Sequence, residues 1–169
     1  MAELVDQVDE DDRVVAVVER AEAMRARLLH RIAVTVCRDA EDRILVHRRP
    51  DDDSRHPGHY DTVAGGAAEA GESYGEAAAR ELREELGIRL AEPPRLVFKR
   101  IYEGPYGPYW MGVHEARLGP AETASITPEP REIAWWGWMT VDEIRDAART
   151  LPFVGGEGSA LWTYLEETG

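Results

Sequence analysis

Short apolar, β-rich segments bounded by turn-forming residues recur along the chain and predict a protein rich in strands. Two of them, at residues 4–8 and 14–18, flank the turn "DEDDR" and predict an N-terminal hairpin. Two more, at 31–37 and 43–49, are joined by "RDAED" and predict a second hairpin. Further strands are expected near 60–64 and at 94–103, 109–118 and 133–139.

Helical composition and spacing alternate with these strands. Helices are expected at residues 19–30, 73–87, 141–149 and 157–167, and the polar stretch 119–131 is expected to be a long loop. This mixed order favours an α/β fold in which helices cover both faces of a mixed β-sheet. Without an internal repeat or a linker, residues 1–169 are expected to form a single domain, with residues 1–29 as an N-terminal hairpin and helix extension.

The helix beginning near Ser73 has clear signals at both ends. Ser73 and Glu76 have the S-x-x-E spacing of a capping box, and Gly87 is a suitable residue to end the helix about 13 residues later. With about 100° of rotation per residue, Ala78, Leu82 and Leu86 form an apolar stripe that should face the core.

Glutamates gather on one flank of this helix. Glu85 lies next to the apolar stripe, and Glu81, Glu84 and Arg80 follow around the same side. The like-charge pair of Glu81 and Glu85, four residues apart, costs a few tenths of a kcal/mol in an isolated helix. Clustered carboxylates suit Mg²⁺ or Mn²⁺, which prefer oxygen ligands. Spacing alone leaves two interpretations open, a metal site and a solvated helix face.

Composition and charge limit the classes of binding partner and the cellular compartment that we expect. A formal net charge of −13 would repel a nucleic acid polymer, but a divalent cation can bridge acidic side chains to the phosphates of a small molecule. No apolar run approaches the roughly 20 residues needed to span a bilayer. The acidic start lacks the features of a secretory signal, and the single cysteine, Cys37, suits a reducing cytoplasm and a place in the core.

The segment 65–88 also resembles the Nudix box, G-x5-E-x7-R-E-U-x-E-E-x-G-U, where U is aliphatic. It matches the pattern at every specified position, Gly66, Glu72, Arg80, Glu81, Leu82, Glu84, Glu85, Gly87 and Ile88. The resemblance implies a Nudix fold and hydrolysis of a diphosphate linkage in a nucleotide or nucleoside-diphosphate derivative. It is highly specific because nine positions are fixed within 23 residues.

The resemblance also implies roles for individual residues. Glu81, Glu84, Glu85 and the Gly65 carbonyl correspond to metal ligands, for Mg²⁺ or Mn²⁺, and the three glutamates to catalytic residues. Arg80 would pair with the glutamates and orient them. Glu72 would be a structural carboxylate rather than a ligand.

Beyond the box, residues 4–144 resemble the isopentenyl-diphosphate-isomerase-like branch of the family, through "LLHR", "ILVHRR", "HPGHYDTVAGG" and "EIAWWGWMTVDEI". The isomerase is therefore one alternative. It would have its catalytic cysteine at the position of Ala64 and a metal-binding histidine at that of Ala67, and only His30 corresponds to an isomerase ligand. A second alternative is a non-catalytic binding module, but such modules typically lose box glutamates.

Several residues outside the box are further candidates. Glu132 lies where many relatives have a catalytic base, with Glu129 as the neighbouring alternative. Arg48 or Arg49, at the end of a strand, would bind substrate phosphate, and alternation along the strand allows only one to face the site. Arg49 is preferred. Tyr106, in a loop with Tyr102, Tyr109 and Trp110, would stack on a base. The substrate within the diphosphate class and the existence of a homodimer remain open.

Overall fold

The computed structural model describes residues 1–169, apart from the side chain of Glu157. The strands are β1 (Leu4–Val8), β2 (Val14–Glu19), β3 (Arg31–Arg38), β4 (Ile44–Arg48), β5 (Tyr60–Asp61), β6 (Ala64–Ala67), β7 (Arg95–Gly104), β8 (Gly107–Arg117) and β9 (Trp135–Met139). The helices are α1 (Arg20–Arg25), α2 (Tyr74–Leu86), α3 (Pro120–Ala124), α4 (Val141–Ala147) and α5 (Ala160–Thr168), with a 3₁₀ turn, η1, at Gly156–Gly158. The expected α/β class with a mixed sheet is confirmed.

Strand β3 lies at the centre of the main sheet. It runs parallel to β8 over its whole length and antiparallel to β6 over its first half. β8 in turn forms a long antiparallel hairpin with β7. β3 meets β4 only at Arg38 and Ile44, after which β4 separates and pairs with β5 and β9. The sheet therefore splits around β3, and the gap lies beside the glycine-containing strand β6.

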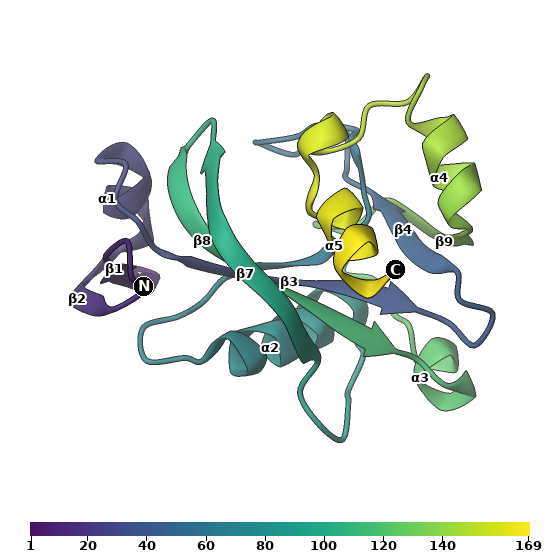
Figure 1. Cartoon of the computed structure of the whole chain (residues 1–169), viewed down its shortest axis with the longest axis horizontal. Helices are drawn as coiled ribbons and strands as arrows, with labels where there is room; N and C mark the ends of the chain where they lie inside the picture. Colours follow the sequence, from purple (N-terminus) through teal and green to yellow (C-terminus); the bar gives the residue numbers. More distant parts are fainter.

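Helices cover both faces of this sheet, as Figure 1 shows with α2 on one side and α4 and α5 on the other. Because side chains alternate along a strand, Val34 and Val36 of β3 pack with Ile144 of α4 and Leu161 of α5, whereas Cys37 packs with Leu82 of α2. The apolar layer that contains Cys37 and Leu82 thus fixes the position of α2 relative to β3. No helix in the described chain is long and apolar enough to cross a membrane.

Helix α2 has the ends and the buried face that its sequence predicts. The Ser73 hydroxyl accepts from the Glu76 amide, the Glu76 carboxylate accepts from the Ser73 amide, and Gly87 ends the helix with a left-handed φ of 68°. Ala78, Leu82 and Leu86 are fully buried. The acidic flank is therefore held at the edge of the core.

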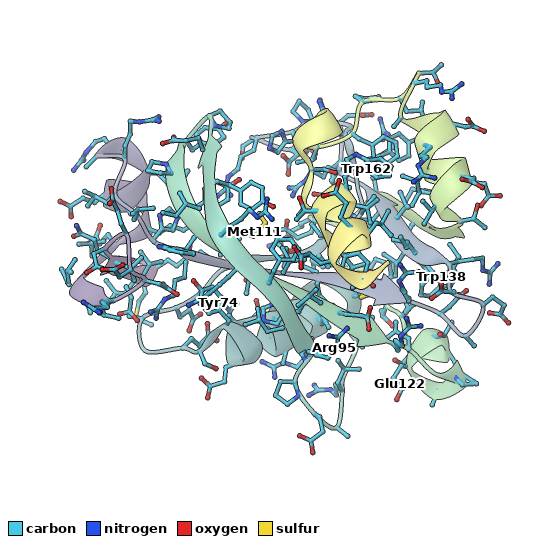
Figure 2. The ribbon with its side chains drawn as sticks, viewed as in Figure 1. Tyr74, Arg95, Met111, Glu122, Trp138 and Trp162 are labelled. Atoms are coloured by element: carbon cyan, nitrogen blue, oxygen red, sulfur yellow. The ribbon has the colours of Figure 1, made fainter. Side chains whose placement is uncertain are left out.

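Among the contacts that attach the N-terminal hairpin, those of the buried carboxylate of Asp12 reach three other elements. Asp12 accepts hydrogen bonds from Arg31 of β3 (2.7 Å), from Lys99 of β7 and from the hydroxyl of Tyr74 (3.0 Å). Figure 2 labels Tyr74 near the start of α2, on the side of the N-terminal hairpin. Burial alone would raise the pKa of Asp12, but the bonds from Lys99, Arg31 and Tyr74 outweigh burial and lower it. The hairpin, the sheet and α2 thus meet at one ionised group.

Three expectations about local structure were wrong. The helix expected at 19–30 is only α1, because Arg27 takes a left-handed φ of 54° and turns the chain toward β3. The polar stretch 119–131 contains a short helix, α3, which has proline at its first position. The strand near 60–64 is two strands, of which β6 continues through Gly65 and Gly66 to Ala67.

Replacing Asp12 with asparagine keeps the size of the side chain and tolerates the left-handed backbone, but it removes the charge between two cations. We expect the free energy of unfolding at neutral pH to fall by about 3 kcal/mol. Since the pKa of Asp12 is lower in the folded chain, the stabilising contribution is full above about pH 4 and is lost as the pH falls through the folded pKa. Urea denaturation of wild type and Asp12→Asn at several pH values tests this.

Asp11→Asn is the matched control, because Asp11 lies in the same turn and is exposed, with only a 3.9 Å ion pair to Arg13. Its loss should cost at most about 1 kcal/mol. Equal effects of the two substitutions would contradict the role assigned to Asp12.

Candidate functional site

Arg80 organises the acidic flank of α2. Its guanidinium binds Glu72 through two parallel bonds of 2.8 and 3.0 Å, donates to Glu81 at 2.9 Å and to Glu84 at 3.2 Å, and also binds the carbonyl of Ala67 at the end of β6. The pairing expected of Arg80 with the glutamates is thus present. Glu72 is held by a bidentate contact, which is the geometry of a structural carboxylate.

Glu81 and Glu84 differ in their surroundings although both contact Arg80. The Glu81 side chain is 13% exposed and that of Glu84 54%. Burial raises the pKa of Glu81, and the nearby Arg80 only partly offsets it. Glu81 therefore lies at the inner edge of the flank and Glu84 at the solvent edge.

The two glycines of β6 make close contacts, Gly66 with α2 and Gly65 with β3. A Cβ atom at Gly66 would lie 2.7 Å from Oε1 of Glu81, and one at Gly65, whose φ is 156°, would lie 2.1 Å from the carbonyl oxygen of Ala33. Any side chain at either position would displace its neighbour. Glycine at Gly66 therefore leaves room for the Glu81 carboxylate, and glycine at Gly65 is required where β6 passes the backbone of β3.

Glu85 is the glutamate of the acidic flank whose negative charge is not paired with a described cation. Among the described contacts its side chain accepts no hydrogen bond and forms no ion pair, although it is partly buried. Burial, then repulsion by Glu81 and Glu132, raises the pKa of Glu85 well above its usual value, and Arg49 opposes this only in part. A local excess of negative charge thus exists at this end of α2.

The loop after α3 is tied to the end of α2 by two backbone bonds. The amides of Thr127 and Glu129 donate to the carbonyls of Leu86 and Glu85, both at 2.8 Å. These carbonyls lack partners within the helix, so the loop satisfies them. The attachment brings Glu132 near enough to raise the pKa of Glu85, whereas the Glu129 carboxylate accepts from the Arg131 amide in its own loop.

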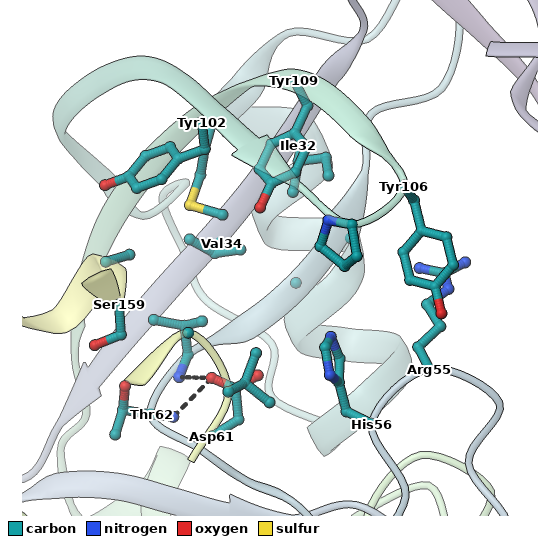
Figure 3. A pocket seen from close by; sticks show the side chains of 18 of the residues that line it. Ile32, Val34, Arg55, His56, Asp61, Thr62, Tyr102, Tyr106, Tyr109 and Ser159 are labelled. Carbon is teal, nitrogen blue, oxygen red and sulfur yellow. Dashed lines mark hydrogen bonds between the residues drawn. The ribbon is translucent and has the colours of Figure 1, made fainter. Parts of the chain in front are cut away.

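A cavity of about 220 Å³ opens beside Glu85. This is several times the roughly 30 Å³ share of one water molecule, so a larger ligand can enter. Figure 3 shows Arg55, His56 and Tyr106 on one side and Tyr102 and Ser159 on the other. Its wall includes four candidates predicted from the sequence, Gly65, Glu85, Arg49 and Tyr106, and the box glycine Gly66.

The arginines that end β4 point in different directions. Arg49 lines the cavity and its Nη2 lies 3.5 Å from Asp61, whereas Arg48 pairs with Asp51 and is not part of the wall. Of the two, Arg49 alone lies at the cavity. Tyr106 also lines the cavity and is 44% exposed, while Tyr102 and Tyr109 stack on each other with ring centroids 6.2 Å apart.

The expected metal ligands do not all converge. Gly65 and Glu85 line the cavity, but Glu81 and Glu84 are turned toward Arg80, and Glu84 and Glu132 are exposed. Among the side chains that the structure describes, no three His, Cys, Asp or Glu groups lie close enough to hold a metal ion. The oxygen donors and the negative charge suit a hard cation, and Glu81 and Glu84 each use only one carboxylate oxygen toward Arg80.

Several residues of the cavity wall were not predicted from the sequence, namely Arg20, Arg55, His56 and Asp61. Asp61 is buried, and one of its oxygens accepts from the amides of Thr62 and Val63 (Figure 3). Arg20 begins α1, Arg55 and His56 belong to the loop between β4 and β5, and Asp61 ends β5. Of these four, only Asp61 has a local signal in the sequence, because it is an acidic residue within a β-rich segment.

Comparison with known proteins adds independent information. A family model described as the NUDIX domain matches residues 28–155. An uncharacterized Nudix hydrolase of Streptomyces coelicolor is 38% identical over 153 residues, covering 90% of this chain and 82% of the relative. A second, from Pseudomonas aeruginosa, is 33% identical over 168 residues, covering 98% and 95%. The crystal structure of DR0079 from Deinococcus radiodurans superposes with a TM-score of 0.72 at 29% identity, covering 90% of this chain and 94% of that one.

The close approach at Gly65 predicts a large effect of one methyl group. Gly65→Ala places Cβ 2.1 Å from the Ala33 carbonyl in a strained backbone, so the pairing of β6 with β3 must shift. We expect a loss of about 3–5 kcal/mol in the free energy of unfolding. Gly158→Ala is the control, because a Cβ there meets no atom within 4 Å, and its effect should stay below about 0.5 kcal/mol. Denaturant titration compares them, and a mild effect at Gly65 would contradict this geometry.

Proposed function

The chain belongs to the Nudix family and is a hydrolase of diphosphate anhydrides, and we propose that it is a metal-dependent pyrophosphohydrolase acting on a nucleotide or a nucleoside-diphosphate derivative. The observation that supports this best is the uncompensated carboxylate of Glu85 on the wall of a cavity that also contains Arg49. A cation at Glu85 would offset the negative charge, and Arg49 would bind the phosphate.

Glu81, Glu84, Glu85 and the Gly65 carbonyl are the residues that would hold Mg²⁺ or Mn²⁺. A bound divalent cation supplies charge neutralisation on phosphate oxygens and a water of lowered pKa. The bonds from Arg80 to Glu81 and Glu84 keep these carboxylates pre-oriented at the helix edge. Because a carboxylate has two oxygens, each glutamate can keep one bond to Arg80 while the other oxygen turns outward.

Outside the helix, the substrate meets two groups of the chain. Arg49 donates to a phosphate oxygen from the cavity wall, and its contacts of 3.5 Å with Asp53 and Asp61 are loose enough to be exchanged. Tyr106, exposed at the mouth, packs on the base or another flat group. Glu132 accepts the proton of the attacking water, a role supported by its closeness to Glu85. Arg48 keeps its ion pair with Asp51 and does not contact the substrate in this proposal.

Isomerase activity is the weaker alternative. Ala64, where the isomerase would have its cysteine, is buried in β6 and has no thiol. Cys37 cannot replace it, because burial raises the pKa of Cys37 to about 12 and the residue lies in the core under α2. A binding module is disfavoured because all box glutamates are present and Arg80 pairs with three of them, Glu72, Glu81 and Glu84.

The proposed partner is a small-molecule diphosphate, and neither a nucleic acid polymer nor a membrane is proposed as a partner. The proposed compartment is the cytoplasm. The acidic balance of the chain and the single buried cysteine support it. The whole of residues 1–169 acts as one domain in this proposal, with residues 1–29 as an extension and residues 65–88 as the catalytic segment.

One panel assay tests the function. Nucleotides, nucleotide sugars, ADP-ribose, dinucleoside polyphosphates and isopentenyl diphosphate are each incubated with the protein and Mg²⁺ or Mn²⁺, and products are identified by phosphate release and mass spectrometry. We expect cleavage of at least one diphosphate compound and no formation of the allylic isomer. Absence of turnover with either metal would favour the binding module, and isomer formation would favour the isomerase.

Glu84→Gln tests the acidic flank directly. The change keeps the size and a hydrogen-bond acceptor for Arg80, but it removes a negative charge. We expect kcat to fall about 100-fold or more, equivalent to about 2.7 kcal/mol of barrier, with the fold retained. Steady-state rates at saturating Mg²⁺ measure this.

Glu76→Gln is the matched control in the same helix. Glu76 is fully exposed, points away from the flank and only completes the capping box. Its change should leave kcat within about twofold and cost only part of the roughly 1 kcal/mol of a cap. Equal activity of the two variants would show that the glutamate flank is only a solvated face.

A further inference from the structure

Three guanidinium groups surround one side of the cavity, and they come from separate parts of the chain. Arg20 begins α1 in the N-terminal extension, Arg49 follows β4, and Arg55 belongs to the loop before β5. His56 lies next to Arg55, as Figure 3 shows. In a chain with a formal net charge of −13, such a concentration of cations in one cavity needs an explanation.

Some hydrogen-bond donors of these arginines have no acceptor among the described atoms. The Nε atoms of Arg20 and Arg49 are buried and have no partner among the described atoms. A buried donor without an acceptor costs free energy, so it points to a missing ligand. Arg55 forms no hydrogen bond or ion pair through its guanidinium with any described side chain, unlike the structural Arg80.

The three cations also repel one another. Burial, and after it the charges of Arg20 and Arg49, lowers the pKa of Arg55. Among the described side chains, Glu3 alone pairs with Arg20, at 3.2 Å, and Asp53 and Asp61 lie 3.5 Å from Arg49. An anion between the guanidiniums would remove the repulsion and satisfy the free donors together.

We propose that Arg20 and Arg55 form a second anion subsite, which binds a phosphate monoester on the same substrate whose diphosphate is held at Arg49 and Glu85. This assignment rests on the proposed function. Guanidinium groups match the geometry of phosphate through paired N–H donors. Arg49, near both Glu85 and Arg55, links the two subsites. The substrate class is therefore a diphosphate compound with a separate terminal phosphate.

Pairs of compounds that differ by one phosphate monoester test this subsite. Coenzyme A with dephospho-coenzyme A, and NADPH with NADH, share a diphosphate linkage and differ only in that group. We expect wild type to have a kcat/KM at least about tenfold higher for the phosphorylated member of a pair. Arg20→Gln and Arg55→Gln should remove this preference and leave the other member within about threefold.

Arg25→Gln is the matched control, because Arg25 is exposed on the same helix as Arg20 and does not line the cavity. It removes the same charge and should alter neither rate. No preference in any cleaved pair, or an equal loss for both members in the Arg55 variant, would overturn the second subsite while leaving the hydrolase intact.

Binding measured without turnover separates the two proposals. Calorimetry with inorganic phosphate, in the absence of metal, should detect binding to wild type and Arg25→Gln but binding at least about tenfold weaker in Arg55→Gln. If the panel shows no hydrolysis but this pattern is present, the anion subsite stands and the proposed function fails. If phosphate binds equally to all three proteins, or to none, the subsite is wrong.

A separate observation concerns β2, which has one free edge. β2 pairs only with β1 among the described strands, and Val14, Val15 and Val17 are 51%, 57% and 56% exposed. An exposed apolar edge without lysine or proline is a template for strand pairing. We therefore expect a second strand to pair with this edge and bury part of the exposed valines.

The sequence of β2 complements itself. In an antiparallel pair of two copies centred on Ala16, Arg13 lies opposite Glu19 and Val14 lies opposite Val18. Arg13 has only the exposed 3.9 Å contact with Asp11, and Glu19 forms no ion pair among the described side chains. We infer that β2 pairs with β2 of a second copy and forms a four-stranded sheet across a homodimer.

Light scattering after gel filtration tests this interface at micromolar concentration. Wild type should be a dimer, Arg13→Glu and Glu19→Arg should each weaken it about tenfold, and the double swap should restore it. Circular dichroism checks that each variant is folded. A monomeric wild type, or a double swap no better than the single changes, would overturn the inferred interface.

Discussion

The structure depends on one guanidinium that holds a set of like charges together. Arg80 binds three glutamates and the carbonyl that ends β6, so it joins α2, the loop before α2 and the glycine strand. Without Arg80, the repulsion among Glu72, Glu81 and Glu84 would act on one helix face next to the core. Glu85 is outside this network, and its charge is the one that the protein alone does not balance.

The fold places this imbalance where a ligand can reach it. Buried leucines on α2 pack against one face of the sheet, so Glu85 lies at the boundary between core and cavity. The division of the sheet between β3 and β4 and the absence of side chains at Gly65 and Gly66 leave space there. Loop contacts with the helix end bring Glu132 nearby.

Sequence predicted the parts governed by local rules. The capping box, the left-handed Gly87 and the apolar stripe of α2 follow from neighbouring residues, and they are present as expected. The short α1 depended on the unfavourable backbone of Arg27, which no spacing rule indicates. Arg20 and Arg55 could not be predicted as neighbours, because their proximity results from the tertiary packing of the hairpin extension against a loop. For the same reason, the sequence allowed only a preference for Arg49 over Arg48. The cavity wall of the folded chain contains Arg49 and not Arg48.

The central claim is that the charge of Glu85 is balanced by a divalent cation. Thermal unfolding of wild type and Glu85→Gln, each with and without Mn²⁺, measures this most directly. Without metal, Glu85→Gln should be at least as stable as wild type, because it removes an unpaired charge. Manganese at 100 times its Kd should stabilise wild type by about 2.7 kcal/mol and leave Glu85→Gln nearly unchanged. An equal response of both proteins to Mn²⁺, or a loss of stability in metal-free Glu85→Gln, would contradict the account.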